Sequence, residues 1–363
     1  MKVLKFGGTS VGSAARIKEV AKLITDGEQK IVVLSAMSGT TNTLVEISDY
    51  LYKKNPEGAN EIINKLEAKY KQHVNELYST PEYKQKGQEL IKSHFDYIRS
   101  YTKDLFTLFE EKVVLAQGEL ISTAMMNYYL QECGVKSILL PALEYMRTDK
   151  NAEPDPVYIK EKLQMQLELH PGAEIYITQG YICRNAYGEI DNLQRGGSDY
   201  TASLIGAAIN ASEIQIWTDI DGMHNNDPRI VDKTAPVRHL HFEEAAELAY
   251  FGAKILHPTC IQPAKYANIP VRLLNTMDPT APGTMISNDT EKGKIKAVAA
   301  KDNITAIKIK SSRMLLANGF LRKVFEIFES YQTSIDMICT SEVGVSVSVD
   351  NTKHLNEILD DLK

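Results

Sequence analysis

Apolar and polar positions change their period several times along this chain. Short apolar runs typical of buried strands lie at residues 31–34, 136–140, 174–183 and 213–218. A shorter run, Val3 and Leu4, opens the chain, and stretches of helical period such as residues 200–210 separate the others. Strands that alternate with helices predict an α/β fold, with a mostly parallel sheet covered by helices on both faces.

Two further segments of the first part have a helical pattern. Residues 57–111 are polar and helical in period with one break at Pro81, which predicts a helical insertion rather than more sheet. Residues 113–134 are predicted to form one helix that stops at Gly134, and another helix is expected to begin near Ser13.

The pattern changes after residues 279–295, where prolines and a glycine precede a polar run, so we expect a domain boundary there. Beyond it, strand and helix patterns follow one another in the order β-α-β-β-α. We therefore expect one domain over residues 1–290 and a small α+β module over residues 291–363. A module of this order usually ends on another strand, so we expect it to be incomplete.

Composition narrows the class of protein. The 363 residues are 43% hydrophobic and 24% charged, as in an ordinary globular protein, and the net charge of −6 argues against a nucleic-acid partner. The four cysteines show no C-x-x-C spacing, which favours a reducing compartment. Neither a basic-then-apolar leader nor an apolar run of about 20 residues occurs. We expect a cytoplasmic protein without a membrane segment.

Residues 5–10, with the sequence KFGGTS, follow the first strand and have the composition of an anion-binding turn. Glycines let the backbone N–H groups approach phosphate oxygens, and Lys5 adds a compact positive charge. The chain contains neither of the two common nucleotide loops, G-x-x-x-x-G-K-[ST] and G-x-G-x-x-G. The motif alone is also compatible with a plain turn after a strand.

A second motif, RGGSDY, occupies residues 195–200 just before a predicted helix. The guanidinium of Arg195 suits bidentate capture of a substrate carboxylate, and Asp199 could hold an ammonium group or a metal ion. The alternative is a glycine turn in which Asp199 merely caps the next helix.

Two charged residues stand in apolar surroundings. Glu119 lies in an apolar stretch and would need a cation or an ammonium group if buried, although a surface glutamate is the commoner case. Lys254 lies among glycine, alanine and leucine. Its ammonium group would either bind a phosphate or extend along the apolar surface into solvent. His239 and His241 lack a third ligand of matching spacing, so we expect no protein metal site.

These features together favour phosphoryl transfer from a nucleotide to an amino acid. A carboxylate acceptor fits best because its pKa of about 4 leaves it ionised at neutral pH, so that no general base is needed. Catalysis then consists of positioning and of neutralising charge by lysine, dipoles and Mg²⁺. The absence of an obvious catalytic base agrees with this interpretation.

Seven motifs, in this order, resemble the aspartate kinase family over essentially the whole chain. They are KFGGTSV (5–11), SAMSGTTN (35–42), GEL (118–120), RGGSDYT (195–201), WTD (217–219), DPR (227–229) and FGAKILHP (251–258). The resemblance implies an amino-acid-kinase catalytic domain followed by ACT regulatory modules. It also implies phosphorylation of the β-carboxylate of L-aspartate with Mg-ATP, the first step towards lysine, methionine and threonine.

The resemblance also implies roles for individual residues. Lys5 and Asp199 would be catalytic, with Lys5 neutralising the transferring phosphoryl group. Aspartate would be held by Thr41, Glu119, Tyr181, Arg195, Ser198 and Asp199, with Arg195 on the α-carboxylate and Glu119 or Asp199 near the ammonium. The nucleotide site would comprise Lys5, Gly7, Gly8, Thr218, Asp219, His224, Arg229 and Lys254. Mg²⁺ would enter with ATP.

The second module resembles the effector site of the lysine-inhibited branch of the family. The implied effector residues are Met314, Gly319, Phe320, Leu321, Asp336, Thr340, Ser341 and Glu342. Backbone N–H groups at the helix start after Gly319 suit an effector carboxylate, and Asp336 suits its amine. A helix that simply begins at a glycine is the alternative.

Three departures from the family pattern qualify these expectations. His224 replaces a tyrosine, Gln194 replaces a glycine, and only one ACT-like unit is present. Because family ACT modules supply a dimer interface, we expect a homodimer, but a less stable one, with weakened or absent feedback inhibition. Two alternatives remain: a sibling kinase acting on glutamate, N-acetylglutamate or a nucleotide monophosphate, and a catalytically silent amino-acid-binding regulatory protein.

Overall fold

The computed structural model describes the whole chain except residues 104, 194–195, 228–229, 251–255, 290–292 and 312–317. The chain divides into two compact units, Met1–Ala299 and Ala300–Lys363. The region in which the sequence predicts a boundary, residues 279–295, contains a strand of the first unit's sheet, β10 (Thr284–Ser287). We describe each unit by itself.

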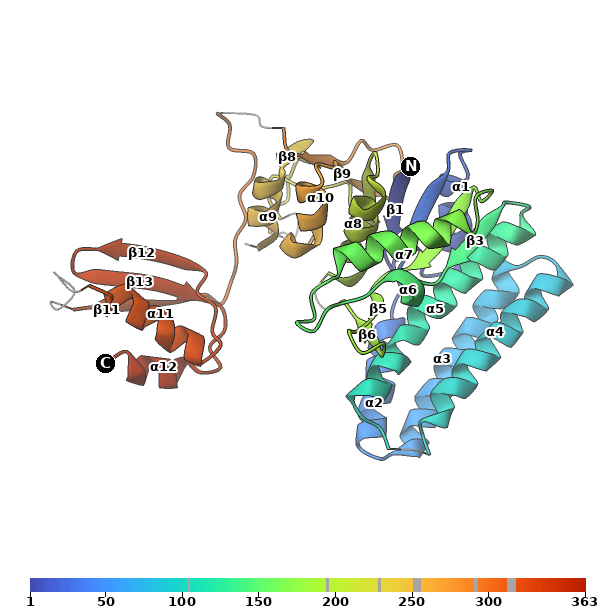
Figure 1. The fold of residues 1–363 in the computed structure, drawn as a ribbon, viewed down its shortest axis with the longest axis horizontal. Helices are drawn as coiled ribbons and strands as arrows, with labels where there is room; N and C mark the ends of the chain where they lie inside the picture. The colour runs from blue at the N-terminus through green and yellow to red at the C-terminus, as the bar shows by residue number, and fades with distance from the viewer. Residues whose placement is uncertain (104, 194–195, 228–229, 251–255, 290–292, 312–317) are drawn as a thin grey trace. The chain divides into compact units, whose positions relative to one another are not determined.

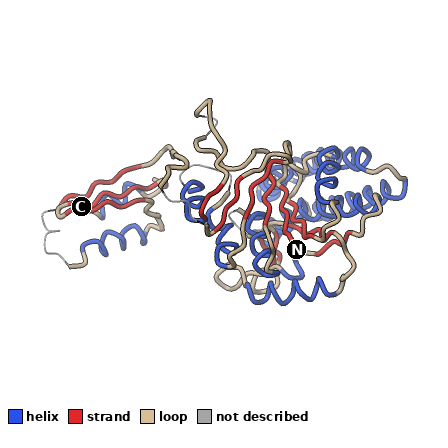
Figure 2. The backbone as a smooth tube through the Cα atoms, turned by 90° about the horizontal axis from the view of Figure 1, so that it is seen from above, coloured by secondary structure: helices blue, strands red, loops and turns tan. Residues whose placement is uncertain are grey.

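The first unit is built on an eight-stranded sheet in the order β3-β4-β2-β1-β7-β9-β10-β8 (Figures 1 and 2). Its pairings are parallel except for β9 with β10, which confirms the predicted, mostly parallel sheet. The other strands are β1 (Lys2–Phe6), β2 (Lys30–Leu34), β3 (Ser137–Leu140), β4 (Ile175–Gln179), β7 (Ile214–Thr218), β8 (His239–His241) and β9 (Val271–Asn275).

Helices cover both faces of this sheet (Figure 2), and each face has its own hydrophobic core. Successive strand residues point to opposite faces, so Leu4 and Val32 pack in one core while Val3 and Ile31 pack in the other. The first core is completed by α1 (Ala14–Ile24), α2 (Thr40–Tyr52), α3 (Pro56–Leu77), α4 (Pro81–Ser100) and α5 (Leu108–Glu132). The second is completed by α6 (Ala142–Tyr145), α7 (Pro156–Glu168), α8 (Gly197–Ile209), α9 (Phe242–Tyr250), the 3₁₀ turn η1 (Pro258–Ile261) and α10 (Gln262–Tyr266).

The helical insertion forms as predicted, and its caps explain its breaks. Helices α3 and α4 are separated before Pro81, where the Thr80 side chain accepts a hydrogen bond from the backbone of Tyr83. Helix α5 begins at Leu108, earlier than the predicted residue 113, because Thr107 and Glu110 form a reciprocal capping box. These two long helices and α5 lie side by side in Figure 1.

One predicted strand is wrong in detail. Residues 174–183 are not continuous, because β4 ends at Gln179 and β5 (Ile182–Arg184) pairs separately with β6 (Ile190–Asn192). Tyr181 between them has a φ of 70°, in the left-handed region that few non-glycine residues adopt. The chain therefore turns sharply at the end of β4.

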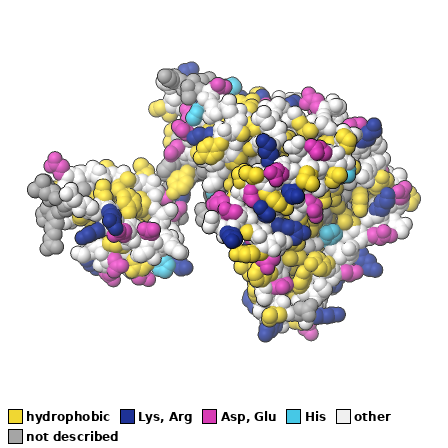
Figure 3. All heavy atoms as spheres, in the orientation of Figure 1, with side chains coloured by type: hydrophobic (Ala, Val, Ile, Leu, Met, Phe, Trp, Pro, Cys, Tyr) yellow, Lys and Arg dark blue, Asp and Glu magenta, His cyan; other side chains and the backbone are white. Residues whose placement is uncertain are grey.

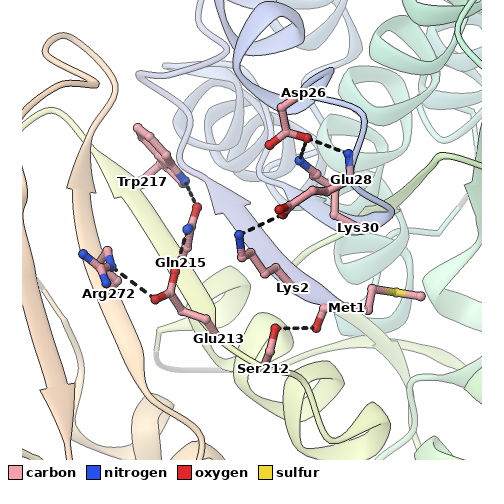
Figure 4. Close-up of polar contacts among 10 residues, drawn as sticks. All are labelled: Met1, Lys2, Asp26, Glu28, Lys30, Ser212, Glu213, Gln215, Trp217 and Arg272. Carbon is pink, nitrogen blue, oxygen red and sulfur yellow. Dashed lines mark hydrogen bonds and ion pairs between the residues drawn. The ribbon is translucent and has the colours of Figure 1, made fainter.

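The end of the sheet at which the parallel strands begin is held by ion pairs (Figure 4). Lys2 at the start of β1 contacts Glu28 at 2.8 Å, and Arg272 in β9 contacts Glu213 at 3.2 Å. Lys30 is 1% exposed and pairs with Asp26. In Figure 3, basic and acidic side chains are intermingled on the face of the first unit that is turned to the viewer.

The second unit has the predicted order β-α-β-β-α. Its elements are β11 (Thr305–Lys310), α11 (Phe320–Ser330), β12 (Met337–Ser341), β13 (Gly344–Val349) and α12 (Leu355–Asp361). The three strands form an antiparallel sheet in the order β11-β13-β12, and its buried side of Ile307, Val345 and Val347 packs on Val324 and Phe328. No described helix of the chain is both long and apolar enough to cross a bilayer.

Candidate active site

The motifs singled out in the sequence meet where four neighbouring strands of the first unit end. Backbone hydrogen bonds extend past the strands: Gly7 N donates to Trp217 O at 3.4 Å, and Ser35 N donates to Phe6 O at 3.2 Å. Gly180 N donates to Leu34 O at 2.9 Å. The loops after β1, β2, β4 and β7 are therefore fixed side by side at the carboxyl edge, where α/β sheets bind ligands.

A pocket of about 390 Å³ opens among these loops. Four residues with a predicted role in substrate binding lie in its wall, together with most of the loop after β2. The lining residues are Gly8, Ser35, Ala36, Met37, Ser38, Gly39, Thr41, Asn42, Glu119, Tyr181 and Ser198. The size suits a small metabolite such as an amino acid.

Lys5 and Asp199 form a largely buried ion pair, with 2.7 Å between Lys5 Nζ and Asp199 Oδ1. Lys5 is the next-to-last residue of β1. Asp199 lies in the first turn of α8, which begins at Gly197. The sequence alternative in which Asp199 only caps a helix is therefore not what the structure shows. The pair places a lysine ammonium beside the glycine turn, because a Cβ at Gly7 would lie 3.5 Å from Lys5 Nζ.

Glycine is required at two points of this site for reasons of space. A Cβ at Gly8 would lie 2.8 Å from Ala36 O, so the turn after β1 touches the loop after β2 through backbone alone. Gly196 has a φ of 75°, and a Cβ there would lie 1.9 Å from Cys260 Sγ. A side chain at Gly8 would therefore displace a wall of the pocket, and one at Gly196 would disturb the start of α8.

Glu119 is the least solvated charged group of the pocket. It is 3% exposed, and its Oε1 accepts a hydrogen bond of 3.2 Å from Ala36 N. Its Oε2 has no hydrogen-bond partner among the described residues. Burial raises the pKa of Glu119 from 4.5 to about 7, against the weaker opposing effect of the Ala36 hydrogen bond. Glu119 lines the pocket, and its unpartnered carboxylate oxygen could accept a hydrogen bond from a cationic ligand group.

Tyr181 and Ser198 also line the pocket. Tyr181 N donates to Thr201 Oγ1 at 3.0 Å, which ties the strained turn after β4 to α8. Ser35 Oγ donates to Ser198 Oγ at 2.9 Å, which joins α8 to the loop after β2. Burial raises the pKa of the Tyr181 hydroxyl to about 12, so this group remains a neutral hydrogen-bond donor.

Those residues assigned to the nucleotide that the structure describes lie next to this pocket or in the loop after β7. Thr218 ends β7 beside the glycine turn, and Asp219 is exposed immediately after it. His224 contacts Asp221 at 2.6 Å through Nε2 and Thr234 at 2.8 Å through Nδ1, so its ring is held within its own loop. Arg195, Arg229 and Lys254 lie outside the described residues, as does Gln194.

The predicted effector residues are in the second unit, with Met314 outside the described residues. Gly319 precedes α11 with a φ of 87°, and Phe320 and Leu321 begin that helix. Asp336 precedes β12, whereas Thr340 and Ser341 end it and Glu342 follows. Asp336 therefore lies just before the start of β12, whereas Thr340, Ser341 and Glu342 lie at its other end. Neighbouring residues along a strand are about 3.4 Å apart.

Sequence reasoning named Thr41 alone from the loop after β2, but residues 35–39 and Asn42 line the pocket as well. The signal was present, since SAMSGTTN is a run of small residues at a strand end. Among the residues that the structure describes, no three His, Cys, Asp or Glu side chains are grouped as a metal site.

Comparison with known proteins supplies the family. A profile of the amino acid kinase family matches residues 1–275. The lysine-sensitive aspartokinase 3 of Escherichia coli is 34% identical over an alignment of 372 positions, which covers 96% of this chain and 78% of that protein. The chain belongs to the amino acid kinase family and, within it, to the aspartokinases.

Other relatives agree. The chloroplastic aspartokinase 1 of Arabidopsis thaliana is 37% identical over 97% of this chain, which spans 63% of that protein's length. The crystal structure of E. coli aspartokinase III with aspartate and ADP (R state) has a TM-score of 0.83 at 34% identity, covering 97% of this chain and 79% of that one. The crystal structure of Clostridium acetobutylicum aspartate kinase has a TM-score of 0.82 at 26% identity. The match covers 100% of this chain and 82% of that one. The chain thus spans less than two thirds of the length of the Arabidopsis relative.

Proposed function

We propose that this aspartokinase family member transfers the γ-phosphoryl group of MgATP to the β-carboxylate of L-aspartate, giving 4-phospho-L-aspartate and ADP. The observation that carries the proposal is the pocket itself: its wall contains Glu119, whose Oε2 lacks a hydrogen-bond partner among the residues that the structure describes, and Ser198, the chain neighbour of Asp199 in the Lys5–Asp199 pair. We propose that the substrate amino acid places its ammonium group at Glu119 and directs the carboxylate to be phosphorylated towards the Lys5–Asp199 pair. The E. coli aspartokinase III structure with aspartate and ADP supports the same assignment.

The chemistry asks little of the protein beyond placement and charge. A β-carboxylate oxygen attacks the γ-phosphorus, the bond to the bridging β,γ-oxygen breaks, and that oxygen leaves with ADP, so no proton has to be removed. Lys5 would neutralise the negative charge that builds up on the transferring group, and Asp199 holds its ammonium in place at 2.7 Å. Mg²⁺ is part of the substrate, bound chiefly through phosphate oxygens and water.

The remaining roles follow from the family resemblance and the placement of the residues. We propose that Thr41, Tyr181, Ser198 and Arg195 hold aspartate, and that the nucleotide lies against the glycine turn and the loop after β7. Residues 1–290 would form the catalytic domain and residues 291–363 an ACT-like regulatory module. An amino-acid effector is proposed, with lysine favoured because E. coli aspartokinase 3 is lysine-sensitive and its T state was solved with lysine. A cytoplasmic homodimer is part of the same proposal.

The test is a coupled assay for ADP release from MgATP, with and without L-aspartate, in which hydroxylamine traps the acyl phosphate. Aspartate-dependent ADP release together with aspartyl hydroxamate would support the proposal. ADP release only with glutamate, N-acetylglutamate or a nucleotide monophosphate would reassign the chain to a sibling activity. Binding of aspartate without turnover under any condition would indicate a regulatory protein instead.

A further inference from the structure

The helical insertion supplies a side chain that reaches the loop lining the pocket. Tyr70 of α3 is 1% exposed, and its hydroxyl lies 2.7 Å from the hydroxyl of Thr40. Thr40 is the first residue of α2 and is itself 1% exposed. Its neighbours on both sides, Gly39 and Thr41, line the pocket. A buried hydrogen bond thus links the insertion to the pocket wall over 30 residues of sequence.

Besides the hydrogen bond from Ser35 to Ser198 of α8, three further attachments hold the same loop. On the β1 side, Ser38 N donates to Gly8 O at 3.1 Å. On the α5 side, Ser122 Oγ donates to Ser35 O at 2.8 Å. On the α3 side, the Tyr70 hydroxyl is joined by Lys69, whose Nζ donates to Ser38 O at 3.3 Å. The first two attachments belong to the sheet and its adjoining helix, whereas the third comes from the insertion alone.

The insertion is built to hold Tyr70 rigidly. The ring of Phe95 in α4 lies 5.9 Å from that of Tyr70, centroid to centroid, and both side chains are buried in the same core. His94, next to Phe95, contacts Gln117 Oε1 at 2.6 Å through Nδ1, two residues before Glu119. The two long helices of the insertion therefore touch both the loop after β2 and the helix segment that carries Glu119.

We propose that Tyr70 is a positioning residue for the substrate pocket: its hydroxyl fixes Thr40, and so sets the conformation of residues 35–42 that line the pocket. This inference rests on the proposed function only in its kinetic consequence. Loss of the hydroxyl leaves the buried Thr40 hydroxyl without that partner, and a loop that is no longer held samples conformations in which the pocket is distorted. The nucleotide side touches this loop at Gly8 but is also held by β1 and β7, so we expect a smaller effect there.

The test compares Tyr70→Phe with Tyr78→Phe. Tyr78 is 2% exposed, lies at the end of the same helix, and donates its hydroxyl to Met125 O at 2.9 Å, away from the pocket. Both substitutions remove one buried hydroxyl from the same core. A merely structural role would make them behave alike.

Amide hydrogen exchange gives a readout that does not need activity. We expect residues 35–42 to exchange about three- to tenfold faster in Tyr70→Phe than in Tyr78→Phe, as the loss of one buried hydrogen bond implies. Equal exchange of this segment in the two variants would overturn the proposal, whether or not the protein turns over aspartate.

Kinetics tests the consequence for the substrate. Tyr70→Phe should raise KM for aspartate about three- to tenfold while KM for MgATP stays within twofold, and Tyr78→Phe should change neither. In a double-mutant cycle with Thr40→Val, the effects of the two substitutions should not add, because they remove the two ends of one bond. Additive effects, or an equal rise in both KM values, would refute the positioning role. An inactive wild-type protein would instead refute the proposed function and leave the exchange experiment to decide.

Discussion

The buried carboxylate of Glu119 should destabilise the folded protein by an amount that grows with pH. Its pKa in the folded protein, about 7, lies above the ordinary value of 4.5, so the ionised form is disfavoured by folding. Below pH 4.5 the group is protonated in both states and costs nothing. As the pH rises from 4.5 to 7 the unfolded state ionises first, and the fold loses stability. The loss reaches about 3 kcal/mol by pH 8, at about 1.4 kcal/mol per pH unit.

The substitution that removes this cost is Glu119→Gln, which keeps an oxygen to accept the hydrogen bond from Ala36 N. Without ligand, the variant should be more stable than the wild type by about 1–3 kcal/mol at pH 8. The advantage should fall below about 1 kcal/mol at pH 5. Urea titration followed by fluorescence suits this measurement, because the single tryptophan, Trp217, lies buried in β7 of the first unit.

A matched control is Glu144→Gln, which removes the same charge from an exposed position on α6. Its effect on the free energy of unfolding should not change between pH 5 and pH 8. The reasoning is refuted if Glu119→Gln is less stable than the wild type at pH 8, since the carboxylate would then have a stabilising partner in the free protein. Under the proposed function, aspartate should raise the melting temperature of the wild type at pH 8 more than that of Glu119→Gln.

Three further predictions address the rest of the first unit. Lys5→Ala should lower kcat by about 10²- to 10³-fold with an unchanged circular dichroism spectrum, and activity within tenfold of the wild type would remove the lysine from catalysis. Gly196→Ala should lower the free energy of unfolding by more than about 2 kcal/mol, because it combines a φ of 75° with a clash against Cys260 Sγ; a neutral effect in urea titration would contradict the geometry. Asp26→Asn should cost about 1–3 kcal/mol at pH 7 by removing the carboxylate from the buried Lys30, and the same stability as the wild type would show that the pair contributes nothing.

Much of the fold could be predicted from local pattern. The apolar runs at residues 31–34 and 213–218 became β2 and β7, and the break at Pro81 separated α3 from α4. The break at Tyr181 could not be predicted, because a tyrosine with a φ of 70° is stabilised by contacts from α8 that are 20 residues away in sequence. The sequence pattern also did not predict β10, which lies within the expected linker. A four-residue strand is defined by the strands it pairs with, here β8 and β9, and these are separate segments of the chain.

The candidate site was predictable in its residue types but not in its assembly. Glu119 and Lys5 stood out because charge in an apolar or glycine-rich setting demands a partner. That Lys5 finds Asp199, 194 positions away, follows only from the parallel order of the sheet and the start of α8. The contribution of Tyr70 had no signal in the sequence, since a tyrosine at a helical core position is ordinary until its hydroxyl is seen beside Thr40.

The sequence by itself determined most of the elements, their order and the chemical character of the loops, because hydrophobic period, caps and glycine turns act over a few residues. The net charge of −6 indicated that, if the substrates are anions, the positive charge that binds them must be supplied locally. Only the tertiary structure decided which loops share a pocket and which glutamate is buried away from solvent. It also decided which hydroxyl of the insertion forms a hydrogen bond with Thr40, at the end of the loop after β2. These depend on contacts between residues far apart in the chain, and burial, which sets the pKa of Glu119, exists only once those contacts have formed.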